Sequence, residues 1–468
     1  MNYELTNNDD TIVALSTPRA AGALAIIRVS GHDALGVVAR RWQGADIDGM
    51  ASHTAHLGRL LDSDGHLLDE VVLTVFRAPH SFTGEDVVEI SCHGSTWIAQ
   101  QAVLSLIDAG CRQALPGEFT RRAFANGRLD LSQAEAVADV IASHSRASHR
   151  VAMNQMRGAF ARRLATLRAR LLEFVSLLEL ELDFSEEDVT FADRSQLLAL
   201  ARKIHAEVDT LARSYHDGNA IKNGVPVAIV GHTNAGKSTL LNALIGDDRA
   251  IVSDVHGTTR DVIEDTVELG GTLFRFCDTA GLRDTTDTVE RMGIERTLRA
   301  LDEARIIIWM VDATAPRADV DSQSALLSDH TEGKKLIAVV NKNDIADSHD
   351  IEAAKQAVTA IATPDAIIET AVAAPNGVAP VVEAITTAAA WASVDDEALV
   401  VTNVRHYEAL TAASDALLRV IDGLEQGLSG DLVGQDLREV MHHLGTITGE
   451  ITTHEMLGSI FSRFCVGK

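Results

Sequence analysis

The stretch Gly231-His232-Thr233-Asn234-Ala235-Gly236-Lys237-Ser238 decides the fold of the central part of the chain. It fits the phosphate-loop pattern G-x-x-x-x-G-K-[ST], between the strand-like run VAIV (227–230) and the helix-like run STLLNALIG (238–246). The glycines let main-chain N–H groups wrap a β-phosphate, and the helix start adds partial positive charge. In such a loop Lys237 reaches the β- and γ-phosphates, and the Ser238 hydroxyl ligates Mg²⁺. A glycine turn with a purely structural role is the alternative, which the neighbouring motifs address.

Three further polar motifs follow along the chain. Asp278-Thr279-Ala280-Gly281 ends the run LFRFC (273–277) and offers a carboxylate and a flexible glycine beside the γ-phosphate. The loop Gly257–Asp261 carries threonines that can close on magnesium. Asn341-Lys342-Asn343-Asp344 follows an apolar strand, and a carboxylate there accepts hydrogen bonds from N1 and N2 of guanine, which adenine does not offer. Together the motifs predict a GTP-binding protein.

Two elements of a typical small GTPase are missing or altered. The stretch Thr370–Gly377 matches poorly the Ser-Ala pair that contacts guanine, so main-chain amides are expected in its place, with lower nucleotide affinity. Leu282 stands where Ras-like enzymes have a glutamine that orients the attacking water. Asn234 offers a carbonyl oxygen that suits a monovalent cation against the phosphates; a spacer role in a tolerant loop position is the alternative.

The rest of the chain indicates several domains. Strand-like runs (227–230, 273–277, 305–311, 336–340 and 366–369) alternate with helical ones, which is typical of a parallel sheet with crossover helices. Residues 132–215 and those after about 395 are helical, and we expect Gly218–Val225 to break the first helical segment. Neither segment buries its apolar stripe alone, so we expect them to pack together around an inserted α/β unit. The first 120 residues are predicted to mix strands (23–29, 71–76 and 87–91) with a helix over 97–109.

Composition excludes several classes of protein. The 468 residues, 46% hydrophobic and 23% charged, suit two to four globular domains. The net charge of −26 makes nonspecific polyanion binding unfavourable. Four dispersed cysteines, a polar N-terminal segment and the lack of an 18-residue apolar run predict a soluble cytosolic protein that does not enter a membrane.

Further motifs are spread over the whole chain: NDDTIVALST (8–17), IIRVSG (26–31), SFTGEDVVEI (81–90), PGEFTRRAF (116–124), LDLSQAEAVADVI (129–141) and FCVGK (464–468). With this combination the chain closely resembles the MnmE (TrmE) tRNA modification GTPases, a TrmE/Era-like family of P-loop GTPases. A ribosome-assembly or signalling GTPase shares the nucleotide motifs but lacks SFTGED and FCVGK. A third interpretation is a folate-binding protein with a degenerate GTPase domain. The intact Lys237, Ser238 and Asp278 argue against it.

The resemblance implies an α/β multidomain fold. Its parts are an N-terminal α+β folate-binding and dimerisation domain (1–122), a discontinuous helical domain (123–220 and 390–468) and an inserted Ras-like P-loop GTPase domain (221–389). It implies a cytoplasmic homodimer that acts on tRNA with the FAD-dependent flavoprotein MnmG. The implied reaction couples GTP hydrolysis to installing a carboxymethylaminomethyl or aminomethyl group at C5 of the wobble uridine. A 5-formyl or 5,10-methylene tetrahydrofolate supplies the one-carbon unit.

The resemblance also implies roles for single residues. K⁺ is assigned to Asn234, Ser253, Val255 and Thr258, and Mg²⁺ to Ser238 and Thr259. Catalysis is assigned to Lys237, Asp278 and Glu290; by its composition alone, Glu290 is an ordinary first-turn acid of a helix. The reduced folate is assigned to Arg28, Glu89, Arg128 and Lys468. The predicted GTP contacts are Asn234, Ala235, Gly236, Lys237, Ser238, Thr239, Ser253, Asp254, Val255, His256, Gly257, Thr258, Thr259, Asp278, Thr279, Ala280, Gly281, Asn341, Lys342 and Asp344.

Two features of the sequence each allow two interpretations. Between Arg146 and Arg170 the chain has seven arginines and no acidic residue, which suits either an RNA-facing stripe or a solvated helix face paired with Glu179–Asp188. Cys465 is either a reactive thiol or a small buried apolar residue.

Overall fold

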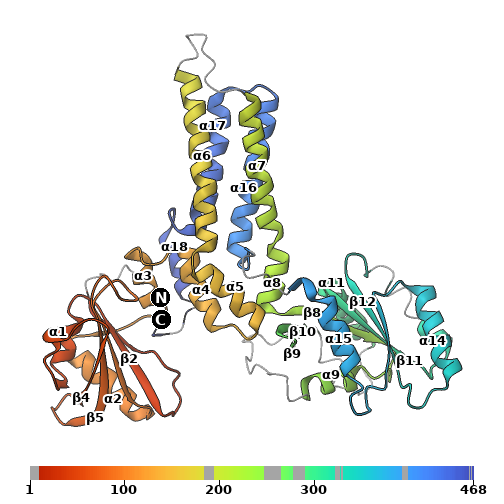
Figure 1. Cartoon of the computed structure of the whole chain (residues 1–468), viewed down its shortest axis with the longest axis horizontal. Helices are drawn as coiled ribbons and strands as arrows, with labels where there is room; N and C mark the ends of the chain where they lie inside the picture. The colour runs from red at the N-terminus through yellow and green to blue at the C-terminus, as the bar shows by residue number, and fades with distance from the viewer. Residues whose placement is uncertain are drawn as a thin grey trace. The chain divides into compact units, whose positions relative to one another are not determined.

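The computed structural model describes residues 10–183, 194–246, 265–277, 290–321, 327, 330–392, 399–462, 464 and 466–467. The chain divides into two compact units, one formed from 1–138, 155–183 and 437–468, the other from 139–154 and 184–436. Each unit therefore joins segments that are distant in sequence (Figure 1). No helix in the described ranges is both long and apolar enough to cross a bilayer.

The first unit is built on a seven-stranded sheet. Its strand order is β3-β4-β5-β6-β2-β1-β7, and only the β1–β7 pair is parallel. The strands are β1 (Ile12–Leu15), β2 (Leu24–Ser30), β3 (Trp42–Gln43), β4 (Thr54–Leu61), β5 (Leu67–Phe76), β6 (Val87–His93) and β7 (Arg112–Gln113). Buried and exposed residues alternate along β2 and β5, because successive side chains of a strand point to opposite faces. The strands expected near 23–29, 71–76 and 87–91 are confirmed.

Helices of the first unit cover this sheet and extend beyond it. The buried residues of α1 (Ala34–Ala39) and α2 (Thr96–Asp108) share one apolar cluster with the strands, and the short η1 is Ile47–Gly49. The helix expected over 97–109 is α2, which ends before Gly110. The other helices with residues in this unit are α3 (Glu118–Ala125), α4 (Leu131–Ile141), α5 (Arg146–Met156), α6 (Ala159–Asp183), α17 (Gly430–Thr448) and α18 (His454–Phe461). Phe461 and Phe464 pack on Leu131 and Ala134, so the end of the chain joins the first unit.

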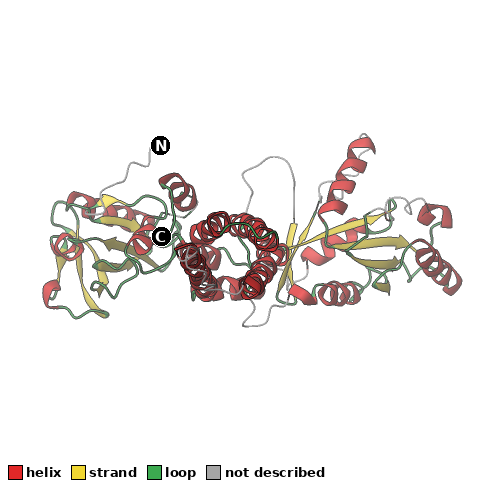
Figure 2. Ribbon diagram, turned by 90° about the horizontal axis from the view of Figure 1, so that it is seen from above, coloured by secondary structure: helices red, strands yellow, loops and turns green. Residues whose placement is uncertain are grey.

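The second unit contains the predicted α/β fold. Its strand order is β13-β12-β11-β8-β10-β9, and all pairs are parallel except β9–β10. The strands are β8 (Val225–Gly231), β9 (Asp265–Leu269), β10 (Thr272–Phe276), β11 (Ile306–Asp312), β12 (Lys335–Asn341) and β13 (Ala366–Glu369). The helices beside the sheet are α9 (Lys237–Gly246), α11 (Glu290–Glu303), α12 (Arg317–Asp321), α14 (Ser348–Ile361), α15 (Ala379–Ala388) and η2 (Ala390–Ala392). Figure 2 shows helices on both sides of this sheet, in agreement with two separate apolar clusters.

The helical segments on either side of this α/β unit pack together, as expected. Helix α7 (Arg194–Arg213) lies against α16 (Val404–Glu425). The helical segment ends within the expected range Gly218–Val225, but only at Gly224, because α8 (Tyr215–Asn223) continues through Gly218. A Cβ atom at Gly218 would lie 2.1 Å from the main-chain oxygen of Val401, so this glycine permits a close backbone approach. The structure confirms an α/β multidomain fold with a discontinuous helical part around an inserted α/β unit.

Candidate functional site

The phosphate loop lies between β8 and α9, at the carboxyl end of the sheet. Beside β8 the strand order switches direction, since β8 pairs with both β10 and β11, and ligands of such sheets bind at this point. Gly231 has a φ of 152°, and a Cβ atom there would lie 2.4 Å from the Met310 oxygen. Gly236 has a φ of 104°, and its Cβ would lie 2.3 Å from Asn341 Nδ2. The loop therefore requires both glycines of the motif.

Lys237 bends back over the loop. Its Nζ donates to the main-chain oxygens of Gly231 at 2.7 Å and His232 at 2.9 Å. Burial lowers the pKa of this lysine. These contacts hold the ammonium group above the loop that would carry the phosphates.

Asn234 adopts the left-handed conformation, with a φ of 66°. Asparagine and glycine tolerate this conformation far better than most residues. Asn234 is exposed and lines a cavity beside the loop. The backbone therefore gives a structural reason for asparagine here that is independent of any cation.

Asn341 ties two loops together. Its Nδ2 donates to the Ala235 oxygen at 2.9 Å, and its Oδ1 accepts from the Val372 N–H at 2.9 Å. The side chain is almost fully buried. Asn341 thus positions the phosphate loop and the loop after β13, while Asp344 remains exposed in the turn after β12, where a base is accessible to it.

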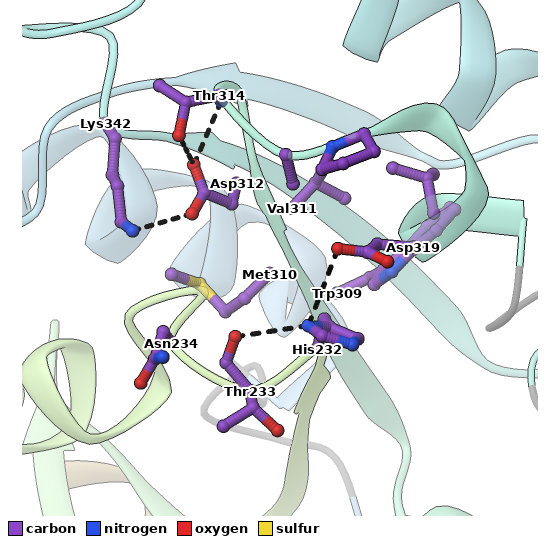
Figure 3. A pocket seen from close by; sticks show the side chains of 13 residues that line it. His232, Thr233, Asn234, Trp309, Met310, Val311, Asp312, Thr314, Asp319 and Lys342 are labelled. Atoms are coloured by element: carbon purple, nitrogen blue, oxygen red, sulfur yellow. Dashed lines mark hydrogen bonds and ion pairs between the residues drawn. The ribbon is translucent and has the colours of Figure 1, made fainter.

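Two residues beside the site, Asp312 and Thr314, belong to none of the predicted motifs. Asp312, at the end of β11, pairs with Lys342 at 2.6 Å and accepts from Thr314 Oγ1 at 2.7 Å (Figure 3). Burial alone would raise the pKa of Asp312, but the bonds from Lys342 and Thr314 outweigh it and lower the pKa. The run Asp312-Ala313-Thr314 at the end of an apolar strand was the only sequence signal for Asp312 and Thr314.

A cavity of about 390 Å³ adjoins the loop. Trp309 and Met310 line it from β11, and His232, Thr233 and Asn234 line it from the phosphate loop. His232 Nδ1 lies 3.9 Å from Asp319 Oδ2 on α12 (Figure 3).

Several predicted site residues lie outside the described ranges. They are Ser253, Asp254, Val255, His256, Gly257, Thr258, Thr259, Asp278, Thr279, Ala280, Gly281, Cys465 and Lys468. Glu290 is the first residue of α11. Ala235, Gly236, Lys237, Ser238 and Thr239 follow one another into α9, as the motif requires.

The described residues assigned to folate, Arg28, Glu89 and Arg128, belong to the first unit. Arg28 and Glu89 face each other across β2 and β6, with Arg28 Nη2 2.7 Å from Glu89 Oε1. The Arg28 guanidinium lies 5.3 Å from the Phe82 ring centroid and 5.7 Å from that of Phe119. Glu89 already has a cationic partner, so a ligand that pairs with Glu89 competes with Arg28.

Two further segments border this region. A Cβ atom at Gly84 would lie 3.1 Å from Arg128 Cγ, so the Arg128 stem runs along the SFTGED loop. Ser16 Oγ donates to the Gly467 oxygen at 3.2 Å, and Val466 packs on the cluster that contains Phe119. The chain end therefore reaches the sheet that holds Arg28.

A buried ionic network joins the N-terminal motifs, and sequence reasoning missed it. Glu118, 1% exposed, accepts from Arg112 Nη2 at 2.6 Å and from the Leu115 N–H at 2.8 Å. Arg122 pairs with Asp10 at 2.6 Å and with Glu85 at 3.2 Å. Burial raises the pKa of Glu118, but the bonds from Arg112 and Leu115 outweigh it and lower the pKa. Charges at distant sequence positions give no signal that they meet.

We expect Glu118→Gln to lower the free energy of unfolding by about 1.5–3 kcal/mol, because it removes the buried charged acceptor of Arg112 and of the Leu115 N–H, while Arg112 and Arg122 keep Asp10 as a partner. A carboxylate with a lowered pKa stabilises the fold above its unfolded pKa of about 4.3, and this stabilisation is lost as pH falls through the folded pKa. The difference from wild type should therefore shrink below about pH 4. Denaturant unfolding followed by circular dichroism measures it, with the exposed Glu70→Gln as control. Equal stability of wild type and Glu118→Gln at pH 7 would contradict the role of the network.

The strand order, the phosphate loop and the guanine motif define a P-loop GTP-binding protein with a second, discontinuous unit. Family models for the MnmE helical domain and for the GTP-binding protein TrmE N-terminus match residues 131–465 and 11–128. The chain therefore belongs to the MnmE (TrmE) family of tRNA modification GTPases.

Curated relatives match the chain over almost its full length. The chain is 51% identical over 470 residues to the tRNA modification GTPase MnmE of Bacteroides fragilis, covering 98% of this chain and 100% of the relative. It is 49% identical over 465 residues to the protein of the same name in Parabacteroides distasonis, and 46% identical over 467 residues to that of Flavobacterium johnsoniae. In both comparisons the match covers 98% of this chain and 100% of the relative.

Proposed function

We propose that the chain is a potassium-dependent GTPase that modifies C5 of the wobble uridine of certain tRNAs. The added group is carboxymethylaminomethyl or aminomethyl, made with the FAD-dependent partner MnmG and a folate one-carbon unit. The enzyme class, a GTP hydrolase of tRNA modification, follows from family membership. The observation that supports the proposal most is the intact phosphate loop, with Lys237 above it, in a chain that also carries the N-terminal family motifs.

The nucleotide chemistry is assigned as follows. Ser238 and Thr259 hold Mg²⁺, which neutralises charge on the β- and γ-phosphates when bound. Asn234, Ser253, Val255 and Thr258 offer oxygen atoms to K⁺, and the exposed position of Asn234 at the loop edge is compatible with this role. Glu290 at the start of α11 orients water indirectly, in place of the glutamine that Leu282 replaces.

The folate assignment has support from the first unit. Glu89 offers a carboxylate for the ring nitrogens, and Arg28, Arg128 and Lys468 offer cations for the glutamate tail. Phe82 and Phe119 both lie beside the Arg28 guanidinium, and the half-buried Phe82 offers an aromatic face to the planar ring of the folate, whereas Phe119 is fully buried. The chain is further proposed to be a cytoplasmic homodimer paired through residues 1–122, with the helical domain at 123–220 and 390–468 and the GTPase domain at 221–389.

Deleting Val466–Lys468 should abolish binding of 5-formyl-tetrahydrofolate while leaving GTP binding unchanged. The deletion removes the cation of Lys468 and the contact of Gly467 with Ser16, next to the sheet that holds Arg28. Isothermal calorimetry with both ligands measures this, and the GTP titration serves as the folding control. Equal folate affinity in the truncated chain would refute the placement.

Mass spectrometry of tRNA nucleosides from a strain that lacks this gene tests the proposed reaction. The C5-modified wobble uridine should disappear, and other modified nucleosides should persist. Unchanged levels of the modified uridine would contradict the proposal and would favour a GTPase that only switches partners.

A further inference from the structure

The proposed substrate is a polyanion, whereas the chain carries a net charge of −26. A surface that holds RNA phosphates must therefore concentrate cations locally and exclude carboxylates. Residues 140–172 meet the compositional condition, with seven arginines and no aspartate or glutamate.

In the first unit, the turn between α5 and α6 gathers part of this charge. Arg157, Arg162 and Arg163 are all exposed. Gly158, with a φ of 75°, makes the turn, and Arg162 Nη1 donates to the Arg157 main-chain oxygen at 2.8 Å. Gln133 Nε2 donates to the Met156 oxygen at 3.0 Å, so a neighbouring helix fixes the turn. We call Arg157, Arg162 and Arg163 the arginine surface.

The buried face of α6 explains why the side chains of the arginine surface are exposed to solvent. Phe160, Leu164, Leu167, Leu171 and Phe174 are at most 1% exposed and form the buried stripe of the helix. Arg162 is exposed and lies on the helix face opposite to that stripe. The helix therefore presents its cations to solvent from a fixed backbone.

The pairing of Arg157 and Arg162 differs from that of other arginines in the same unit. Arg40 pairs with Asp33, Arg59 with Glu70, and Arg168, further along α6, with Glu450. Among the described residues, Arg157 and Arg162 form no ion pair with a carboxylate. Exposed helix faces that are stabilised by their own ion pairs carry charges of both signs, so the exposed Arg157 and Arg162, which form no such pair, favour an external anion.

We propose that the arginine surface binds phosphates of the tRNA backbone. The inference rests on the proposed function only in taking tRNA as the substrate. Phosphate contacts fix position and carry no sequence information, so the surface should serve tRNAs with different anticodons equally.

Fluorescence anisotropy of the full-length chain with an unmodified tRNA transcript tests this, over a range of KCl concentrations. Arg157→Gln/Arg162→Gln should weaken binding about tenfold and reduce the slope of log K against log [salt] by roughly 1.4–1.8, at about 0.7–0.9 for each of two phosphate contacts. GTP hydrolysis should not change, which reports that the variant is folded. Arg19→Gln/Arg59→Gln removes the same charge from exposed positions of the same unit and should bind as wild type does.

Several results would overturn the proposal. They are equal affinity and slope in wild type and the first variant, an equal loss in the control variant, or no tRNA binding by wild type at low salt. Unchanged tRNA binding with weakened binding of the flavoprotein would assign the surface to a protein partner instead. The nucleoside analysis of the deletion strain remains a separate test of the proposed reaction, so the two failures are distinguishable.

Discussion

GTP hydrolysis by the purified chain should be about 10³-fold faster in potassium than in sodium at equal ionic strength. Leu282 replaces the water-orienting glutamine, so charge that develops between the β- and γ-phosphates needs another positive centre. An arginine finger in other GTPases contributes about 10³-fold or more, and in the proposed site K⁺ held by Asn234 and residues 253–258 would take this place. A phosphate-release assay in the two chloride salts measures the ratio, and equal rates would contradict the cation assignment.

The left-handed backbone of Asn234 decides which variant is informative. Asn234→Ala removes the carbonyl ligand but also strains the loop, because alanine disfavours a φ of 66°. Asn234→Gly removes the ligand and keeps the conformation, so it should erase the potassium effect while retaining GTP affinity. If the Asn234→Gly variant still hydrolyses GTP faster in potassium than in sodium, Asn234 is not a potassium ligand and serves only the geometry of the loop.

Asp344→Asn should lower the affinity for GTP by about 10²-fold. In the predicted contact the Asp344 carboxylate accepts two hydrogen bonds from guanine, and bonds to a charged group contribute about 1.5–3 kcal/mol each. An asparagine offers one acceptor and one donor, which match the N–H and carbonyl oxygen of xanthine. The variant should therefore bind xanthosine triphosphate better than wild type does. Equilibrium titration with fluorescent analogues of both nucleotides measures the change.

Asp347→Asn is the matched control for this experiment. Asp347 lies three residues further along, and its side chain caps α14 by accepting from the N–H groups of His349 and Asp350. Asparagine also caps helices well, so this variant should keep the affinity and base preference of wild type. An Asp344→Asn chain that binds GTP as tightly as the control would remove Asp344 from the guanine site.

The sequence was sufficient to predict those features of the fold and the site that depend on neighbouring residues. The phosphate loop needs only a strand, two glycines and a helix in succession, and β8, Gly231, Gly236 and α9 supply them. Parallel strands also end at one edge, so motifs placed after β8 and β12 were expected to meet there. The packing of α7 on α16 was predictable because neither helical segment buries its apolar stripe alone.

Contacts between distant segments were not predictable. The bridge from Asn341 to Ala235 and Val372 depends on the register of β12 against its neighbours, which no local pattern encodes. The network around Glu118 joins residues up to 112 positions apart. Helix α8 continues through Gly218, which lies close to the main chain of Val401, and only the tertiary structure reveals this contact.

The most direct test of the central claim is whether GTP chemistry at Lys237 drives tRNA modification in cells. The deletion strain is complemented with wild type or with Lys237→Ala, at equal protein levels by immunoblot, and its tRNA nucleosides are measured by mass spectrometry. Wild type should restore the C5-modified wobble uridine, and Lys237→Ala should leave it near the level of the deletion strain. Full restoration by Lys237→Ala would contradict the account.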